Sequence, residues 1–249
     1  MPRYEASPDL LKDRVILITG AADGIGRALA LSCAEHGATT VLLDKNVGNL
    51  ESLYDEIEKK GYPQPALYPL DLEGASPDDY LTMAESIDKQ LGRLDAIVHN
   101  AALMGTITPM HLYKTDAWFK VMQVNINAPF LINQACIPML NEADDARILF
   151  VGDACGQHGS AYWGPYGVSK SGLENMMQIL ADELEHTSIK INSIDPGIVR
   201  TRMRAFAYPA EDPNLHPLPE TIMPAFLYLL GSDSKKYSGQ AFMAEDFLG

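Results

Sequence analysis

The chain of 249 residues has few cysteines, few tryptophans and no long uncharged apolar stretch. Cys33, Cys136 and Cys155 are too few and too scattered for a disulfide framework or a CxxC metal site. No run approaches the roughly 18 to 20 apolar residues that cross a bilayer, so we expect no membrane span. Residues 1–10 include two prolines and three charged residues, a composition that is not typical of a secretory signal.

Positive charge is also scarce. There are 19 Lys and Arg against 33 Asp and Glu, which gives a formal net charge of −14 at pH 7. Phosphate groups repel such a surface, so we expect neither nucleic-acid binding nor attraction to anionic membranes. A chain with 47% hydrophobic and 21% charged residues can still bury a sizeable core. The composition therefore predicts a cytoplasmic α/β protein that is an enzyme or a ligand-binding domain.

Short apolar runs alternate with amphipathic stretches along the whole chain. The runs predict strands near residues 15–18, 40–43, 66–70, 96–98, 148–151 and 189–191, and the stretches predict helices over 25–36, 47–60, 77–91, 117–140 and 168–185. This alternation is typical of a parallel sheet with right-handed crossovers. Pro69 cannot donate to a central ladder, so its strand belongs at an edge, as the third strand does in the order 3-2-1-4-5-6.

No linker or repeat divides the chain. We therefore expect one Rossmann-type, doubly wound α/β domain over residues 1–249, with about seven mostly parallel strands and helices on both faces. Residues 209–219 contain four prolines and predict a loop rather than a domain boundary. The region around 200–220 is the expected substrate lid. Arg200, Arg202 and Arg204 lie in it, either to meet an acidic group or simply on an exposed face.

A glycine-rich turn follows the first predicted strand. Gly20, Gly24 and Gly26 have the spacing GxxxGxG, a variant of the dinucleotide fingerprint that lets the backbone approach a pyrophosphate at a helix N-terminus. Asp44 ends the second strand about 20 residues further on, where a carboxylate can accept hydrogen bonds from an adenosine ribose. The alternatives are that the glycine-rich turn binds no ligand and that Asp44 only caps the next helix. Lys45, which follows, has the charge to attract a 2′-phosphate.

Tyr166 and Lys170 are four residues apart on a predicted helix and therefore share one face. A phenol with a pKa near 10 is a poor acid–base catalyst at neutral pH, but a neighbouring ammonium stabilises the phenolate. The pair is a candidate proton-transfer site. His158 and Trp163 precede it, where a substrate pocket is expected, although a His in a loop can equally be a surface residue.

Together these motifs resemble the short-chain dehydrogenase/reductase family over the whole chain. Residues 176–183 and the Trp163-Gly164-x-Tyr166 segment are similar to the bacterial YciK-type branch of that family. The resemblance implies that Tyr166 protonates a carbonyl or deprotonates an alcohol, that Lys170 lowers the Tyr166 pKa and holds the nicotinamide ribose, and that Asn125 holds a proton-relay water. It implies cofactor contacts from the following residues: Gly20, Asp23, Gly24, Ile25, Gly26, Asp44, Asp71, Leu72, Asn100, Ala101, Tyr166, Lys170, Pro196, Gly197 and Thr201.

Two positions depart from the family pattern, and Ala102 in place of a Gly is the milder of the two. Asp153 stands where the family has a Ser that hydrogen-bonds the substrate carbonyl. An ionised carboxylate cannot donate a hydrogen bond, and its charge raises the pKa of a nearby phenol. We therefore expect weak carbonyl reduction, unless burial keeps Asp153 protonated and able to donate.

Four further expectations follow. Asp44 and Asp23 favour NAD(H) over NADP(H), because both carboxylates would repel a 2′-phosphate. The apolar sides of residues 117–140 and 168–184 predict a homodimer or homotetramer. No His pair has the spacing of a helical metal site, so we expect no metal. The expected activity is an oxidoreductase with a hydroxyl or carbonyl substrate, and the alternative is a dinucleotide-binding sensor or scaffold with little turnover.

Overall fold

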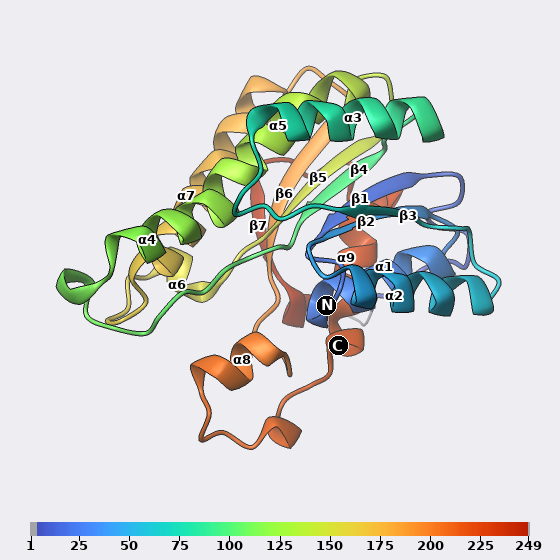
Figure 1. Cartoon of the computed structure of the whole chain (residues 1–249). Helices are drawn as coiled ribbons and strands as arrows, with labels where there is room; N and C mark the ends of the chain where they lie inside the picture. Colours follow the sequence, from blue (N-terminus) through green and yellow to red (C-terminus); the bar gives the residue numbers. More distant parts are fainter. Residues whose placement is uncertain (1–3, 249) are drawn as a thin grey trace.

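The computed structural model describes residues 4–248 and contains one parallel sheet of seven strands in the order β3-β2-β1-β4-β5-β6-β7 (Figure 1). The strands are β1 (Val15–Thr19), β2 (Thr39–Asp44), β3 (Ala66–Pro69), β4 (Ala96–His99), β5 (Ala146–Val151), β6 (Ile189–Asp195) and β7 (Gln240–Met243). The doubly wound topology is confirmed, and β3 lies at the edge, where Pro69 costs no ladder bond. The sequence contains no apolar run that predicts β7, because this edge strand is only partly buried.

Helices cover both faces of the sheet. One face carries α1 (Gly24–Glu35), α2 (Val47–Lys59) and α9 (Met223–Leu230), and the other carries α3 (Pro77–Leu91), α5 (Ala128–Leu140) and α7 (Gly164–Glu183) (Figure 1). The short helices α4 (Thr115–Met122), α6 (Ala154–Gln157) and α8 (Arg202–Ala207) follow the carboxyl ends of β4, β5 and β6. The central strands are buried on both sides, which explains their unbroken apolar sequences. Within residues 4–248 we find no helix with the length and hydropathy that a membrane span requires.

The single helix predicted over 117–140 is instead divided. Between α4 and α5 the backbone widens into a π-helical turn, Gln123–Asn127. Pro129 has no N–H to donate to the carbonyl of Asn125, so the regular hydrogen-bond ladder cannot continue through this point. The turn places Asn125 in a fully buried position.

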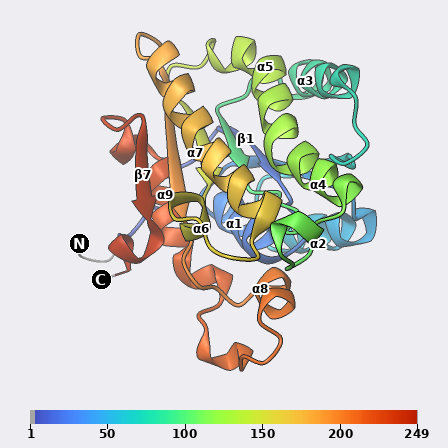
Figure 2. The same cartoon turned by 90° about the vertical axis from the view of Figure 1, so that its left-hand side faces the viewer.

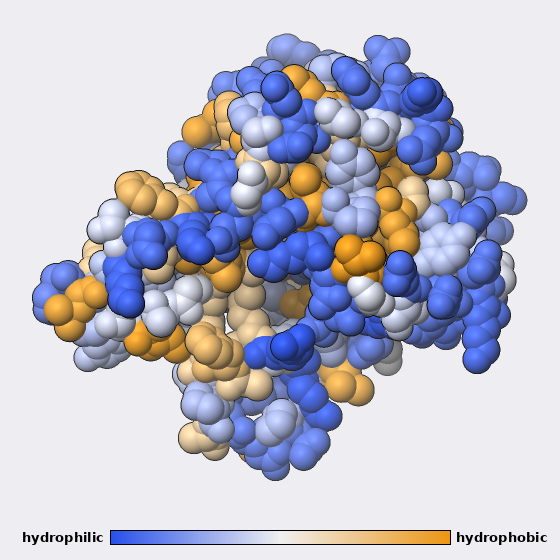
Figure 3. Space-filling model, viewed as in Figure 1, coloured by the Kyte–Doolittle hydropathy of each residue, from blue (hydrophilic) through white to orange (hydrophobic). Residues whose placement is uncertain are grey.

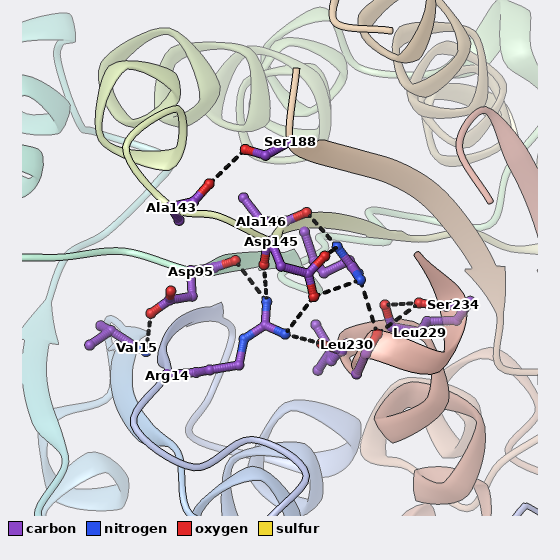
Figure 4. A network of polar contacts seen from close by, with 12 residues as sticks. Arg14, Val15, Asp95, Ala143, Asp145, Ala146, Ser188, Leu229, Leu230 and Ser234 are labelled. Atoms are coloured by element: carbon purple, nitrogen blue, oxygen red, sulfur yellow. Dashed lines mark hydrogen bonds and ion pairs between the residues drawn. The ribbon is translucent and has the colours of Figure 1, made fainter. Parts of the chain in front are cut away.

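One buried and one part-buried arginine tie the amino-terminal edge of the sheet to the end of α9 (Figure 4). Arg147 in β5 is only 1% exposed and donates to the Asp145 carboxylate at 2.6 and 3.0 Å and to the Gly231 carbonyl at 3.1 Å. Arg14 donates to the Leu230 carbonyl at 2.9 Å. Cations at a helix C-terminus are favourable, and each buried charge here has an acceptor. This edge is therefore closed by structural contacts, which leaves the carboxyl edge for a site.

Candidate active site

A cleft of about 700 Å³ opens at the carboxyl edge of the sheet, between the strand ends and the α8 segment. Figure 3 shows the surface hollowed between that segment and the body of the domain. In an open α/β sheet this edge is where ligands bind. The predicted lid residues 200–220 contribute α8 and the loop after it, which project from the body in Figures 1 and 2.

The glycine turn forms one wall of the cleft. Gly20 has a φ of 68°, and a Cβ on Gly26 would lie 2.1 Å from the Gly20 carbonyl oxygen, so neither position tolerates a side chain. The Asn100 amide donates to the carbonyls of Thr19 at 2.9 Å and Gly20 at 3.2 Å, which fixes the turn against the end of β4. Asp23 accepts from the Gly24 N–H at 2.8 Å and caps α1. The turn thus leaves room for a phosphate group beside a helix N-terminus and fits a dinucleotide.

The carboxylates of the rim already have partners. Asp44 accepts hydrogen bonds from the N–H groups of Ala22 at 3.3 Å and Asn46 at 2.9 Å. Asp23 lies 3.6 Å from the guanidinium of Arg202. Lys45 also lines the cleft, with its ammonium 3.7 Å from Asp71. The acidity of this rim is therefore offset by backbone donors and by two cations.

Tyr166 and Lys170 lie on the first turns of α7 at the base of the cleft. The Tyr166 hydroxyl donates to the Asp153 carboxylate at 3.0 Å. Asp153 also accepts from the Cys155 N–H at 2.9 Å, as the N-cap of α6. The Lys170 ammonium donates to the Val151 carbonyl at 2.7 Å and lies 5.5 Å from the centre of the Tyr166 ring. Asp153 is thus directly bonded to the phenol, whereas Lys170 is not.

Burial governs the protonation of this pair. The pKa of Tyr166 is raised well above its usual value, first by burial and then by the charge of Asp153. Burial also lowers the pKa of Lys170, although the neighbouring carboxylates oppose this. The lowering of the Tyr166 pKa expected from Lys170 is outweighed. At neutral pH the phenol therefore keeps its proton, and any reaction that needs the phenolate is disfavoured.

Asn125 does not line the cleft but is bonded to the elements around the Tyr166–Lys170 pair. Its amide accepts from the Leu103 N–H at 2.7 Å and donates to the Leu103 carbonyl at 3.0 Å and to the Ser169 hydroxyl at 2.9 Å. Ser169 in turn donates to the Tyr166 carbonyl at 2.7 Å. Asn125 therefore joins the loop after β4 to the helix that carries Tyr166 and Lys170.

The cleft brings together most of the site residues expected from the sequence. Its lining includes Gly20, Asp23, Gly24, Ile25, Asp44, Asn100, Ala101, Asp153, Tyr166, Lys170, Pro196, Gly197 and Thr201. Gly26, Asp71, Leu72 and Asn125 are not part of this lining. Trp163 lies in the cleft wall, whereas His158 does not. His99 is buried and bonded to Asn133, as a structural histidine would be.

Asp195 was not identified from the sequence. It ends β6, is 7% exposed, and accepts from the Gly197 N–H at 2.8 Å. Burial and the charge of Asp153 both raise its pKa. The sequence signal that could have identified it is an acidic residue at the end of an apolar strand, directly before Pro196-Gly197. The carboxyl ends of neighbouring parallel strands lie close together, so such a residue is expected near Asp153.

Comparison with solved structures corrects the cofactor prediction. A short chain dehydrogenase of Shigella flexneri, solved in complex with NADP, has a TM-score of 0.94 and 41% identity, and the match covers 96% of this chain and 100% of that one. A short chain dehydrogenase of Escherichia coli, solved with NADPH, has a TM-score of 0.93 and 42% identity over 96% and 99% of the two chains.

The predicted preference for NAD(H) is therefore wrong. Its basis was the charge of Asp44 and Asp23, and both carboxylates are already bound by the protein. Lys45 and Arg202 add positive charge to the same rim. A count of acidic residues in the sequence could not show this compensation.

The family is shown by two comparisons. The model of the short chain dehydrogenase family matches residues 14–212. The uncharacterized oxidoreductase YciK of Escherichia coli is 41% identical over 242 residues, which are 97% of this chain and 96% of that protein. Both agree with the parallel sheet, the glycine turn and the Tyr166–Lys170 pair described above. The chain belongs to the short-chain dehydrogenase/reductase family and is an oxidoreductase.

Proposed function

We propose that this protein transfers a hydride between NADP(H) and a small-molecule substrate with a hydroxyl group or its oxidised counterpart. The observation that carries the proposal is the buried Tyr166–Lys170 pair at the base of a cleft whose glycine turn fits a pyrophosphate. The bound nicotinamide supplies or accepts the hydride. Gly20, Gly24 and the start of α1 would hold the phosphates, and Lys170 would hold the nicotinamide ribose.

Tyr166 is the proton donor in the reducing direction. Its raised pKa keeps the phenol protonated, so it can give a proton to an oxygen that gains charge. The single O–H, however, already donates to Asp153. A substrate carbonyl must therefore compete with a carboxylate for the same proton. This competition slows reduction, and the raised pKa of Tyr166 disfavours the phenolate that oxidation needs. The same competition favours the second candidate, a dinucleotide-binding protein with little turnover.

The two candidates are separated by measuring binding and turnover in the same preparation. Calorimetry should show NADPH binding in either case. Loss of absorbance at 340 nm with a panel of ketones, aldehydes and related acceptors should show turnover only for the enzyme. NADPH binding without turnover of any acceptor would support the sensor or scaffold, and absence of NADPH binding would contradict both.

Lys45 is the proposed contact for the 2′-phosphate. Lys45→Ala is expected to weaken NADPH binding about tenfold, since one hydrogen-bonded charge pair is worth about 1.4 kcal/mol, and to leave NADH binding unchanged. Calorimetric titration of both cofactors measures this difference. Lys89→Ala, at the exposed end of α3, is the matched control. An equal loss for the two cofactors would assign Lys45 a structural role instead.

We further propose that the protein self-associates through α5 and α7. These helices lie side by side in Figure 2 and form an apolar groove. Phe130 is 51% exposed and Ile179 is 49% exposed on it, and burying them against a second copy would be favourable. Ile179→Lys is expected to shift the mass measured by light scattering toward the 27.3 kDa monomer. Leu81→Lys on α3, at an equally exposed leucine, is the control and should not change the measured mass. A monomeric wild type at micromolar concentration would contradict the proposal.

A further inference from the structure

We propose that the substrate of this site is a carbon–nitrogen double bond, bound as the protonated iminium, with the Asp153 carboxylate accepting the hydrogen bond from the substrate N–H. This inference rests on the proposed function and names its substrate class. It begins from the observation that a carboxylate holds the position nearest the Tyr166 hydroxyl, where a carbonyl substrate needs a donor.

Asp153 is built as an acceptor. Its hydrogen bonds with the described residues are accepted, from the Tyr166 hydroxyl on one oxygen and from the Cys155 N–H on the other. Each carboxylate oxygen can accept about two hydrogen bonds, so acceptor capacity remains for a ligand. Such a group repels the oxygen of a ketone and attracts a nitrogen that carries a proton.

The charged groups around Asp153 also favour a cationic ligand over a neutral one. Asp195 approaches from the end of β6, and Lys170 approaches from α7. The Lys170 ammonium is bonded to the Val151 carbonyl and forms no ion pair with Asp153 among the described residues. Asp153 and Lys170 line the cleft, and the buried Asp195, which does not line it, adds the charge of a second carboxylate that acts on Lys170. A cationic substrate would improve this balance, whereas a neutral ketone would not.

The wall of the cleft also suits a cation. Trp163 lies in this wall, with its ring 5.6 Å from that of Tyr166 and 6.2 Å from that of Tyr208. Aromatic faces attract organic cations. The structure already contains such a contact, because the Arg204 guanidinium lies 3.7 Å from the centre of the Tyr208 ring.

Reduction of an iminium needs no hydrogen-bond donor to a substrate oxygen. The iminium carbon gains a hydride, the electron pair of the C=N bond moves to nitrogen, and NADPH is oxidised by two electrons to NADP⁺. The nitrogen already carries its proton, so the product is a neutral amine, which then takes a proton from solvent or from Tyr166. The carboxylate contributes by stabilising the protonated imine, which is a far better hydride acceptor than the neutral form.

The test compares a cyclic imine, 2-methyl-1-pyrroline, with the ketone cyclopentanone as substrates of the full chain with NADPH. The wild type is expected to reduce the imine with a kcat/KM at least about tenfold higher than that for the ketone. Asp153→Asn, which keeps the size and removes the charge, should lower the imine kcat/KM by about ten- to a hundredfold, as expected for a lost hydrogen bond to a charged group. Asp153→Glu, which keeps the charge, should retain part of the wild-type kcat/KM for the imine.

Binding provides a second measurement that does not depend on turnover. In the presence of NADP⁺, the wild type should bind 2-methylpyrrolidine, the protonated product amine, and Asp153→Asn should bind it about ten- to a hundredfold more weakly. Asp116→Asn, which removes an exposed charge on α4, is the matched control for net charge. Unchanged NADPH affinity and melting temperature show that each variant is folded. If Asp153→Asn does not fold, Asp153→Ser replaces it in both measurements.

The inference is overturned if the wild type reduces the ketone as well as the imine, or reduces neither, or if the neutral variant keeps both imine turnover and amine binding. These results leave the proposed oxidoreductase function standing as long as NADPH binds and the ketone is reduced by the wild type or by Asp153→Ser. Absence of NADPH binding would overturn the proposed function itself.

Discussion

Asp153→Ser is expected to raise the kcat/KM for ketone reduction by about 10²–10³-fold, the usual value of one donor to a developing oxyanion. The serine hydroxyl can donate to the substrate oxygen, and the Tyr166 hydroxyl, now 3.0 Å from the Asp153 carboxylate, is released to do the same. The measurement is steady-state NADPH oxidation with ketones for the wild type and the variant across pH.

The pH profile gives the same substitution a second, independent outcome. The charge of Asp153 contributes to the raised pKa of Tyr166, so removing it lowers that pKa. Alcohol oxidation needs the phenolate, which is populated only as pH rises toward the Tyr166 pKa. The alkaline rise in oxidation rate should therefore begin at a lower pH in Asp153→Ser than in the wild type. Robust wild-type ketone reduction at pH 8, unimproved by serine, would show that Asp153 does no harm.

Tyr166→Phe is expected to lower turnover by about 10²–10⁴-fold with every substrate that needs a proton at oxygen, because the variant loses the hydroxyl that is the proposed proton donor. The phenyl ring keeps the packing against Trp163, whose ring lies 5.6 Å away, so the fold and NADPH affinity should be preserved. Stopped-flow NADPH oxidation with the best ketone or aldehyde of the panel measures the loss. Tyr162→Phe, in the exposed loop before α7, is the control.

Two outcomes would contradict this assignment. Full carbonyl reduction in Tyr166→Phe would show that another group supplies the proton. Loss of NADPH binding together with activity would make Tyr166 a binding residue only. Imine reduction is expected to be less sensitive to this substitution than ketone reduction, because an iminium nitrogen already carries its proton.

The topology was predictable because it depends on local signals. Apolar runs of β-branched residues bounded by turns predicted six strands, and Pro69 predicted which of them lies at the edge. The helix over 117–140 was predicted as one piece, because its apolar periodicity continues through the π-helical turn. The turn is explained by the missing N–H of Pro129 and by the burial of Asn125. Edge strand β7 has too little burial to produce an apolar run.

The candidate site was predictable in its parts but not in its electrostatics. A spacing of four placed Tyr166 and Lys170 on one helix face. The resemblance to the family implied that Asp153 lies within reach of the phenol, and the distance in the structure is 3.0 Å. The sequence did not show that Asp44 and Asp23 are satisfied by backbone N–H groups, and the cofactor preference predicted from their charge was therefore wrong. Hydrogen bonds to a carboxylate depend on backbone geometry, which a charge count ignores.

The sequence by itself determined the strand order, the edge of the sheet at which ligands bind, and the family, because each depends on the pattern or spacing of nearby residues. Only the tertiary structure decided which charges meet. Asp195 joins Asp153 and Lys170 because neighbouring parallel strands end together, although these residues come from three separate elements. Burial then raises the pKa of Tyr166 and lowers that of Lys170, since removing water penalises the charged form of each.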